Sequence, residues 1–504
     1  MKLKKKLVEI FKNNYNEKLI FDLQENKEFT YSSVLLNINA ISKFLQKYNL
    51  KKRDKVAVIL DNDYLTAHIH LTLYLDNFIC LPINPQTSKK NVSSIIKENK
   101  IKLIITSERY EKILNNNFKK KIVNFLSIEK IYLLIKNDKS KINKIDALKY
   151  FEKKLSKINF NSTQLKIYTS GTTGASKPVN HSYKNLYVNA KSFINFYKIK
   201  NMSTFWNYLP MSYLGGYFNL LFIPLYSGGR IIVSKPFNSI LLLSCVKIIK
   251  KYKINFLWFT PDIANSFIEF IRDKRDINFI KNSKITFLIG MDHVSHQLKE
   301  KFNNKFKKYL FESYGISETL FLSCNRSKKI THDSGTILKG TKIIIKKENR
   351  ADKYGEIIVK KSPIIKNGTF NTGDLGNLKN GKIYFHSRKK DILIKGGINI
   401  SPLEVENLLN NFSIISKCCL LETKNSLEQK KLILVFKKSL NYKKNDYLKK
   451  IKKYALLVIE PNKRPDFFYE INNFPLTSSG KIKRNILNIW VKKLKINNDV
   501  IFKK

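Results

Sequence analysis

Residues 168–177 restrict most strongly what this chain can fold into. They read Tyr-Thr-Ser-Gly-Thr-Thr-Gly-Ala-Ser-Lys. Glycine adopts positive φ without steric cost, so successive N–H groups can turn toward one anion, while hydroxyls and Lys177 add donors. Residues 164–168 alternate polar and apolar like a short strand, and apolar residues at helical spacing follow Ser182, a candidate N-cap. Strand, glycine-rich loop and helix in this order predict an α/β fold with a phosphate-binding loop.

Four further motifs follow this loop. They are Tyr314-Gly-Ile-Ser-Glu318-Thr319, then Asn-Thr-Gly-Asp-Leu-Gly at 371–376, Ser-Arg-Lys-Lys-Asp at 387–391 leading to Gly396 and Gly397, and Pro-Leu-Thr-Ser-Ser-Gly-Lys-Ile-Lys-Arg at 475–484. Any one alone is typical of an ordinary turn, because Gly, Asn, Asp and Ser dominate turns. All five in this order indicate a nucleotide-using enzyme.

The five motifs together resemble those of the adenylate-forming superfamily, which includes acyl-CoA synthetases, nonribosomal peptide adenylation domains and beetle luciferases. Residues 209–216, Leu-Pro-Met-Ser-Tyr-Leu-Gly-Gly, are similar to its acyl-pocket motif. The resemblance implies an α/β fold in which residues 1–388 form a large N-terminal lobe of layered α/β subdomains plus a β-barrel-like part. Residues 391–504 would form a small mobile α+β C-terminal domain, the lid, with its hinge at 389–390 and Lys390 as the pivot.

The resemblance also implies roles for individual residues. It places ATP against Thr169, Ser170, Gly171, Thr172, Thr173, Gly174, Lys177, Tyr314, Gly315, Ser317, Asp374 and Phe385. It assigns catalysis to Lys481, Glu318 and Arg388, with Glu318 as the ligand of Mg²⁺. It places the acid in a pocket of Tyr213, Gly215, Gly216, Asn219, Gly290 and Met291, and the thiol in a tunnel beside Gly396 and Gly397. Within the ATP site, Tyr314 and Phe385 would face the adenine, while Asp374 and Arg388 would hold the ribose.

The reaction implied by this resemblance has two steps. A substrate carboxylate attacks the α-phosphorus of Mg-ATP, giving an acyl-adenylate and pyrophosphate, and a phosphopantetheine thiol then displaces AMP. Lys481 is expected to bridge the carboxylate and the α-phosphate, where negative charge redistributes in the transition state. We expect free CoA as the acceptor because the sequence shows no carrier module, and a separate acyl carrier protein is the alternative. The pocket residues favour a fatty or aryl acid without choosing between them.

Several positions depart from the family pattern. Pro178 stands where glycine is usual and removes an N–H next to Lys177. Met291 and Asp292 stand where Gly-Ala is common, and Ser317 replaces a usual threonine while keeping the hydroxyl. We therefore expect the loop after Lys177, and the acyl and adenine pockets, to differ from those of relatives.

The formal net charge of +55 raises the alternative of a basic nucleic-acid-binding protein without catalysis. Only ten of the 94 basic residues are arginine, and lysines spread along the whole chain. Base recognition favours the arginine fork, so this pattern favours compositional drift. We expect no stable nucleic-acid partner, and a surface that attracts ATP, CoA phosphates or an acidic carrier protein. Since arginine is scarce, Arg388 and Arg484 mark positions where lysine should not substitute.

Composition excludes several other classes of protein. At 504 residues and 43% hydrophobic content, the chain can bury substantial cores and is not disordered. Five cysteines without CxxC spacing indicate neither a disulfide framework nor a zinc site. No apolar run approaches the ~20 residues of a membrane span, and the basic N-terminus is unlike a signal peptide. We expect a cytoplasmic enzyme whose seven histidines, His181 among them, are structural.

Overall fold

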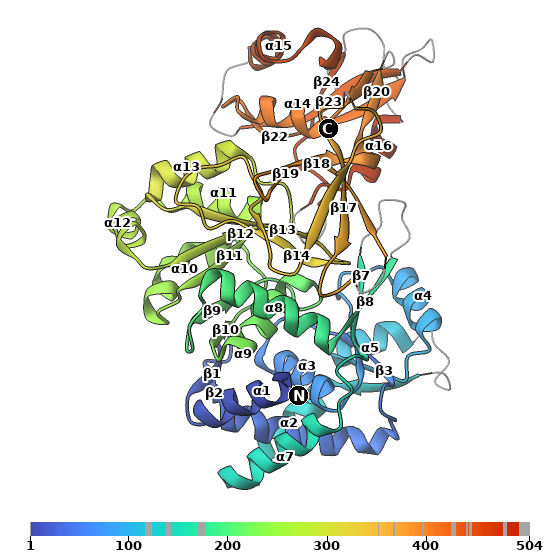
Figure 1. Ribbon diagram of the computed structural model, residues 1–504, viewed down its shortest axis with the longest axis vertical. Helices are drawn as coiled ribbons and strands as arrows, with labels where there is room; N and C mark the ends of the chain where they lie inside the picture. Colours follow the sequence, from blue (N-terminus) through green and yellow to red (C-terminus); the bar gives the residue numbers. More distant parts are fainter. Residues whose placement is uncertain are drawn as a thin grey trace.

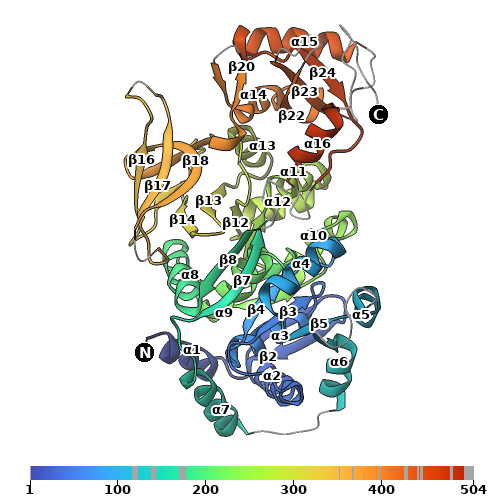
Figure 2. The same cartoon turned by 90° about the vertical axis from the view of Figure 1, so that its right-hand side faces the viewer.

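The computed structural model describes residues 2–115, 123–137, 143–169, 177–350, 352–365, 368–395, 398–424, 430–439, 442, 446–476 and 481–492. A large lobe contains the N-terminal and central parts of the chain, and a smaller domain with the C-terminal part sits at its upper end (Figure 1). Turning the view by 90° shows the same elongated arrangement (Figure 2). This mixed architecture confirms the predicted α/β fold class.

The N-terminal sheet has six strands in the order β6-β5-β3-β4-β7-β8, parallel except for its last pair. The strands are β3 Lys55–Ile59, β4 Ile79–Pro82, β5 Leu103–Thr106, β6 Asn124–Ser127, β7 Thr163–Thr169 and β8 Lys177–Ser182. Along β3, Val56 and Val58 join one apolar core, while Ala57 and Ile59 join another. Successive side chains of a strand point to opposite faces, so this sheet is buried on both sides.

The second sheet has thirteen strands in the order β16-β17-β18-β19-β15-β14-β13-β12-β11-β9-β10-β1-β2. They are β1 Lys18–Asp22, β2 Lys27–Thr30, β9 Thr204–Asn207, β10 Arg230–Val233, β11 Phe256–Phe259, β12 Thr286–Ile289, β13 Leu310–Ile316, β14 Leu320–Cys324, β15 Thr336–Ile337, β16 Lys342–Lys346, β17 Gly355–Lys361, β18 Phe370–Lys379 and β19 Lys382–Arg388. The six neighbouring strands β13, β12, β11, β9, β10 and β1 pair in parallel. From β13 to β16 they are antiparallel, so the part expected to be barrel-like continues the parallel sheet.

The sheets are covered by helices, most of which begin at a polar N-cap. The helices are α1 Lys2–Asn13, α2 Tyr31–Leu45, α3 Tyr64–Leu75, α4 Lys89–Asn99, α5 Glu108–Asn115, α6 Ile128–Asn137, α7 Lys144–Ser156, α8 Tyr183–Tyr197, α9 Ile223–Ser227, α10 Ser239–Lys251, α11 Pro261–Phe270, α12 Lys274–Asn282, α13 His296–Phe306, α14 Pro402–Asn410, α15 Tyr447–Val458 and α16 Arg484–Lys492. Asp63 and Ser182, for example, accept backbone N–H groups at the starts of α3 and α8.

The small domain has its own sheets and cores. Strands β20 Leu393–Lys395 and β21 Ile398–Ile400 form a hairpin, while β22 Ile415–Lys424, β23 Lys430–Lys438 and β24 Phe467–Glu470 form a sheet with α14, α15 and α16 beside it (Figure 2). Apolar residues of α14, α15 and β23 pack in one core of this domain. The chain leaves the large sheet at Arg388 and passes a 3₁₀ turn at Lys389–Asp391. The domain boundary and the hinge stay predictions.

The predicted strand–loop–helix order was wrong in one respect. A further strand, β8, stands between the glycine-rich residues and α8, and it pairs antiparallel with β7 so that Thr169 faces Lys177. Val179 and His181 are buried while Pro178 and Asn180 are exposed, which is the alternation of a strand at a sheet edge. Pro178 disguised this strand in the sequence, although an edge strand tolerates proline. Strand β8 therefore stands between Lys177, the last residue of the motif, and the N-terminus of α8.

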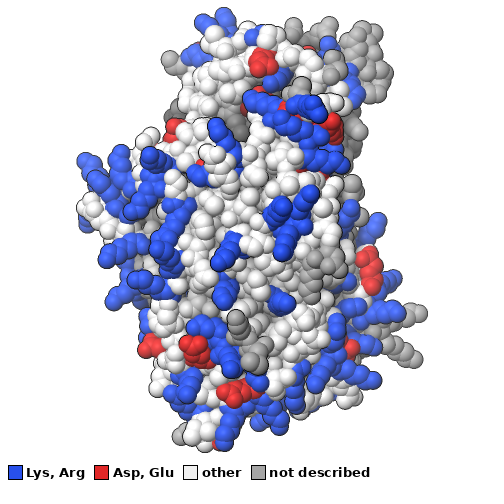
Figure 3. Space-filling model, in the orientation of Figure 1, with Lys and Arg blue, Asp and Glu red and all other residues white. Residues whose placement is uncertain are grey.

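Basic side chains are spread over the molecule as the sequence predicted. On the face shown in Figure 3, lysines and arginines lie over every part of the fold and acidic residues are few. Within the described residues, no helix is both long enough and apolar enough to cross a membrane.

Two histidines in the core make a testable contribution to stability. His68 and His70 on α3 are 0% and 1% exposed, and burial lowers the pKa of each to about 3. The unfolded chain would protonate them near pH 6.5, so it binds more protons than the folded state. Their stabilising contribution is full above about pH 6.5 and falls as the pH drops toward 3, by ~1.4 kcal/mol per pH unit for each histidine.

The His68→Leu protein should therefore lose less stability than the wild type when the pH falls from 7.5 to 5.0. The expected difference is about 2 kcal/mol, which is ~1.4 kcal/mol over the ~1.5 pH units below the unfolded pKa. Urea denaturation of both proteins at the two pH values measures it. An identical loss in both proteins would contradict the assignment.

Candidate active site

The hairpin of β18 and β19 places the predicted ribose-binding pair. Its two-residue turn is Asn380-Gly381, with φ of 50° and 70°, as a type I′ turn requires. The register then shifts by one residue between Leu375 and Gly376, so that Asp374 lies directly opposite Arg388. A Cβ on Gly376 would lie 2.4 Å from the carbonyl oxygen of Tyr384, so this irregular pairing needs glycine there.

Asp374 is a buried carboxylate with two protein partners. The Tyr314 hydroxyl donates to its Oδ2 at 2.8 Å, and the Arg388 Nε lies 3.3 Å from Oδ1. Its side chain is 3% exposed. Burial raises the pKa of Asp374, while the charge of Arg388 and the Tyr314 hydrogen bond oppose that rise. Oδ1 has no hydrogen bond with the described residues, and this orphaned buried acceptor is suited to a ligand hydroxyl.

Charges from distant parts of the sequence converge on this carboxylate. Lys481 and Lys390 act on Asp374 in the same direction as Arg388, favouring its ionised form. Burial and Arg388 lower the pKa of Lys390, while the charges of Asp374 and Glu318, among others, raise it. The structure thus places Arg388, Lys390 and Lys481 within electrostatic range of Asp374, and Glu318 within electrostatic range of Lys390.

Tyr314 and Phe385, the two rings expected to face the adenine, are not placed to hold a base between them. Their ring centroids are 6.0 Å apart and the planes are inclined by 35°. This is the spacing of two aromatic side chains in direct contact, and both belong to one apolar cluster. A base therefore does not lie between them in this arrangement. On one outer side of the pair, His293 approaches Phe385 with ring centroids 5.9 Å apart.

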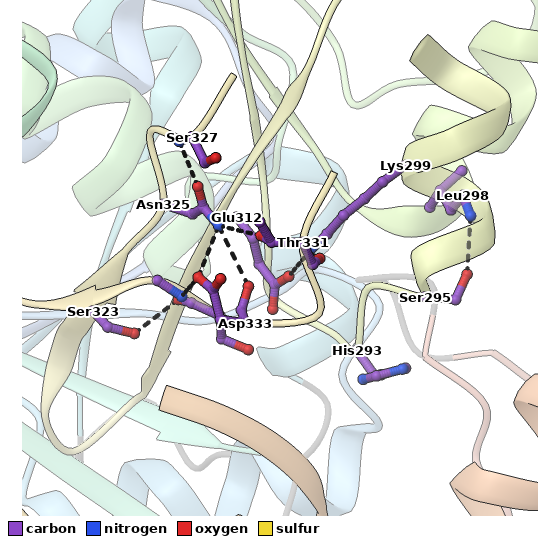
Figure 4. Close-up of polar contacts among 12 residues, drawn as sticks. His293, Ser295, Leu298, Lys299, Glu312, Ser323, Asn325, Ser327, Thr331 and Asp333 are labelled. Carbon is purple, nitrogen blue, oxygen red and sulfur yellow. Dashed lines mark hydrogen bonds and ion pairs between the residues drawn. The ribbon is translucent and has the colours of Figure 1, made fainter. Parts of the chain in front are cut away.

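A buried polar network supports the strand that carries Tyr314 (Figure 4). Lys299 reaches from α13 to Glu312 on β13, with Nζ 2.6 Å from Oε2 and side chains only 6% and 10% exposed. Lys299 Nζ also donates to the carbonyl oxygen of Thr331 at 3.0 Å, and Asn325 N donates to the Glu312 carbonyl at 2.7 Å. Removing one partner of such a buried pair leaves an uncompensated charge, so this network fixes β13 two residues before Tyr314.

Glu318 lies in the turn at 317–319 between β13 and β14 and is half-buried. Its carboxylate makes no hydrogen bond with another described residue, and acidic oxygens are the ligands that Mg²⁺ prefers. The Ser317 carbonyl oxygen lies 2.7 Å from His181 Nε2. The sequence predicts a structural histidine at position 181 but does not indicate this contact. Its alternation with Val179 on β8 was the only signal, and a strand pattern cannot reveal a contact across two sheets.

The predicted acid pocket lies at the carboxyl ends of the parallel strands, where open α/β sheets bind ligands. Gly215 and Gly216 begin a buried π-helix, Gly215–Phe222, which also contains Asn219. Met291, just after β12, has a left-handed φ of 71°. Its Cε and Sδ each lie 2.9 Å from where a Cβ on Gly215 would be, so the thioether occupies the space above that glycine.

The other predicted pocket residues surround this pair. The Tyr213 hydroxyl accepts from Asn84 Nδ2 at 3.3 Å. Gly290 packs closely on the residue before Tyr314, because a Cβ there would lie 3.0 Å from the Ser313 carbonyl oxygen. The acid pocket and the Tyr314–Asp374 cluster are therefore neighbours.

Some predicted site residues lie outside the described part of the chain. These are Ser170, Gly171, Thr172, Thr173 and Gly174 of the loop, and Gly396 and Gly397 of the thiol tunnel. The loop's two flanking positions, Thr169 and Lys177, pair across β7 and β8.

A cavity of about 600 Å³ separates the lobe from the lid beside Phe385. Three polar contacts bridge the two parts near it. Lys417 Nζ lies 2.9 Å from Asp262 Oδ1 on α11, Asn407 Nδ2 lies 3.0 Å from His293 Nε2, and Gln297 Nε2 donates to the Asn411 carbonyl at 3.5 Å.

Comparisons with known proteins agree with this arrangement. The long-chain-fatty-acid–CoA ligase of Bacillus subtilis (strain 168) is 24% identical, with 92% of this chain and 90% of the relative covered. The 2-succinylbenzoate–CoA ligase of the same strain is 23% identical, with 92% and 94% covered. Among solved structures, o-succinylbenzoate CoA synthetase from Bacillus subtilis in complex with the acyl-adenylate intermediate OSB-AMP has a TM-score of 0.80 at 19% identity, covering 98% of this chain and 99% of that one.

The profile of the family described as AMP-binding enzyme matches residues 9–367, which is well over half of the sequence. The match runs from α1 through the β13–β14 turn and ends just before the strand that carries Asp374. The chain belongs to the AMP-binding enzyme family.

Proposed function

We propose that this protein is an AMP-forming acid–thiol ligase that activates a carboxylic acid with ATP and transfers the acyl group to CoA. The observation that carries this proposal is the convergence of two cations, Arg388 from the large lobe and Lys481 from the lid, on the buried carboxylate of Asp374. The curated relatives' names, which are those of CoA ligases, point the same way.

In the first step the substrate carboxylate attacks the α-phosphorus, the bond to the bridging oxygen breaks, and pyrophosphate leaves with that electron pair. Asp374 Oδ1 is the acceptor for a ribose hydroxyl, and Arg388 holds the carboxylate in its ionised form. Lys481 supplies positive charge where the carboxylate and the α-phosphate meet, which stabilises the charge that develops in the transition state.

Glu318 fits a magnesium ion, because its carboxylate has no other described hydrogen-bond partner and oxygen is the ligand this ion prefers. When bound, the ion neutralises phosphate charge. Burial raises the pKa of Tyr314 well above its usual range, so this side chain stays a neutral donor and orients Asp374.

In the second step a thiolate displaces AMP from the acyl carbon, and we place the hinge for the accompanying lid movement at Lys390. CoA is the acceptor we favour, since the names of the curated relatives specify it. An acyl carrier protein is the alternative, and the basic surface is the observation in its favour (Figure 3). The relatives' names include both a fatty and an aryl acid, so the acid class stays as open as the pocket residues left it.

Removing the lid lysine tests the proposal. Lys481→Ala should lower ATP–pyrophosphate exchange by a factor of about 10² to 10³, the usual effect of losing one charge-stabilising group. The matched control is Lys483→Ala, an exposed lysine two residues away, which should exchange like the wild type. Exchange is measured with a panel of fatty and aryl acids, with CoA added separately. Normal exchange by Lys481→Ala would contradict the assignment.

The contact between Met291 and Gly215 predicts how the acid range responds to mutation. Met291→Gly removes the thioether above Gly215 and relieves the left-handed backbone, so longer acids should gain by up to about 0.8 kcal/mol, or fourfold, for each added methylene. Gly215→Ala should have the opposite effect, because the new methyl meets Met291. The measurement is kcat/KM over a series of straight-chain acids. A series unchanged by Met291→Gly would place the pocket elsewhere.

A further inference from the structure

The turn that carries Glu318 has little conformational freedom. A Cβ on Gly315 would lie 2.0 Å from the Leu320 carbonyl oxygen, so the two ends of the turn are in close backbone contact. Leu320 has a left-handed φ of 54°, and Thr319 is fully buried with its Oγ1 donating to the Leu320 carbonyl at 3.1 Å. Glu318 therefore lies in a turn whose backbone shape is fixed.

Two side chains that come after the glycine-rich residues in the sequence make hydrogen bonds with the two ends of this turn. His181 on β8 places Nε2 2.7 Å from the Ser317 carbonyl oxygen. Asn189 on α8 donates from Nδ2 to the Phe321 carbonyl at 2.8 Å and accepts from Phe321 N at 3.2 Å. The His181 contact joins the edge of the six-stranded sheet to the turn of the large sheet, and the Asn189 contact joins α8 to the strand that follows this turn.

The protonation state of His181 follows from its surroundings. A carbonyl oxygen only accepts, so Nε2 must carry the hydrogen and donate it to Ser317. His181 is 0% exposed, and burial lowers its pKa to about 4, so the ring is neutral at pH 7. Nδ1 then keeps a bare lone pair with no partner among the described residues. An apolar residue would avoid that orphaned atom, yet only a donor can hold Ser317.

We propose that His181 is a positioning residue that fixes the carboxylate of Glu318 relative to β8, the strand that begins at Lys177. The inference rests on the proposed function, in which Glu318 holds magnesium. Magnesium tolerates little departure from octahedral geometry, so a displaced carboxylate weakens metal binding first. Groups that orient a metal ligand typically change metal affinity by about 10- to 100-fold when removed.

The test compares two buried histidines in the full-length protein. His181→Leu removes the donor to Ser317, whereas His68→Leu removes an equally buried ring whose nitrogens have no hydrogen-bond partner among the described residues. The readout is the Mg²⁺ concentration that half-saturates binding of a non-hydrolysable ATP analogue, measured by calorimetry at pH 7.5. We expect a rise of about 10- to 100-fold for His181→Leu and none for His68→Leu. His181→Gln, whose amide can still donate, should recover part of the affinity.

An unchanged Mg²⁺ requirement in His181→Leu, with a melting temperature lowered no differently from that of His68→Leu, would overturn the inference. If His181→Leu does not fold, Asn189→Ala removes the second support and should raise the same Mg²⁺ requirement, and no rise there would equally overturn it. The proposed function fails separately, if the wild-type protein binds the analogue without any dependence on Mg²⁺ or does not bind it at all.

Discussion

The pairing of Asp374 with Arg388 is the contact on which the candidate site depends. Both residues are ordinary strand positions until the Asn380-Gly381 turn sets the register and one extra residue shifts it. Without that shift Asp374 would face Ser387, and the carboxylate would be buried without a cation beside it. Tyr314 donates to this carboxylate from β13, so the antiparallel extension of the large sheet meets its parallel part at this point. The lid adds Lys481 from outside, which makes the cluster complete only when lobe and lid are together.

Part of this arrangement could be predicted from the sequence, because each motif places its functional groups within a short run of residues of unusual composition. The five motifs supplied Glu318, Asp374, Arg388 and Lys481 as candidate site residues, and their roles stay proposals. Local apolar spacing likewise placed α8 directly after its N-cap, Ser182. The sequence did not predict strand β8. Proline is unusual in strands, so Pro178 argued against one there, and the alternation of buried and exposed residues is evident only from the pairing of β8 with β7.

The remaining features depend on contacts between segments far apart in the sequence. Nothing near Tyr314 reveals that its ring touches Phe385 and leaves no room for a base between them. Similarly, His181 and Ser317 are separated by 136 positions, and their hydrogen bond exists because an edge strand of one sheet lies against a turn of another. Packing and register between distant segments set these positions, whereas composition and periodicity report only on neighbours in the chain.

The polar bridge between lobe and lid has a consequence for how often the two parts separate. Lys417 and Asp262 are 28% and 43% exposed, and ion pairs so open to water contribute roughly 0–1 kcal/mol. Contacts of this kind add little to the stability of the present arrangement. When two arrangements of lobe and lid differ little in free energy, a ligand shifts the population toward the arrangement that it binds better. A few kcal/mol of differential affinity is then enough to reverse which arrangement predominates. The weakness of the bridge would let successive ligands, rather than the protein's own packing, set the order of events.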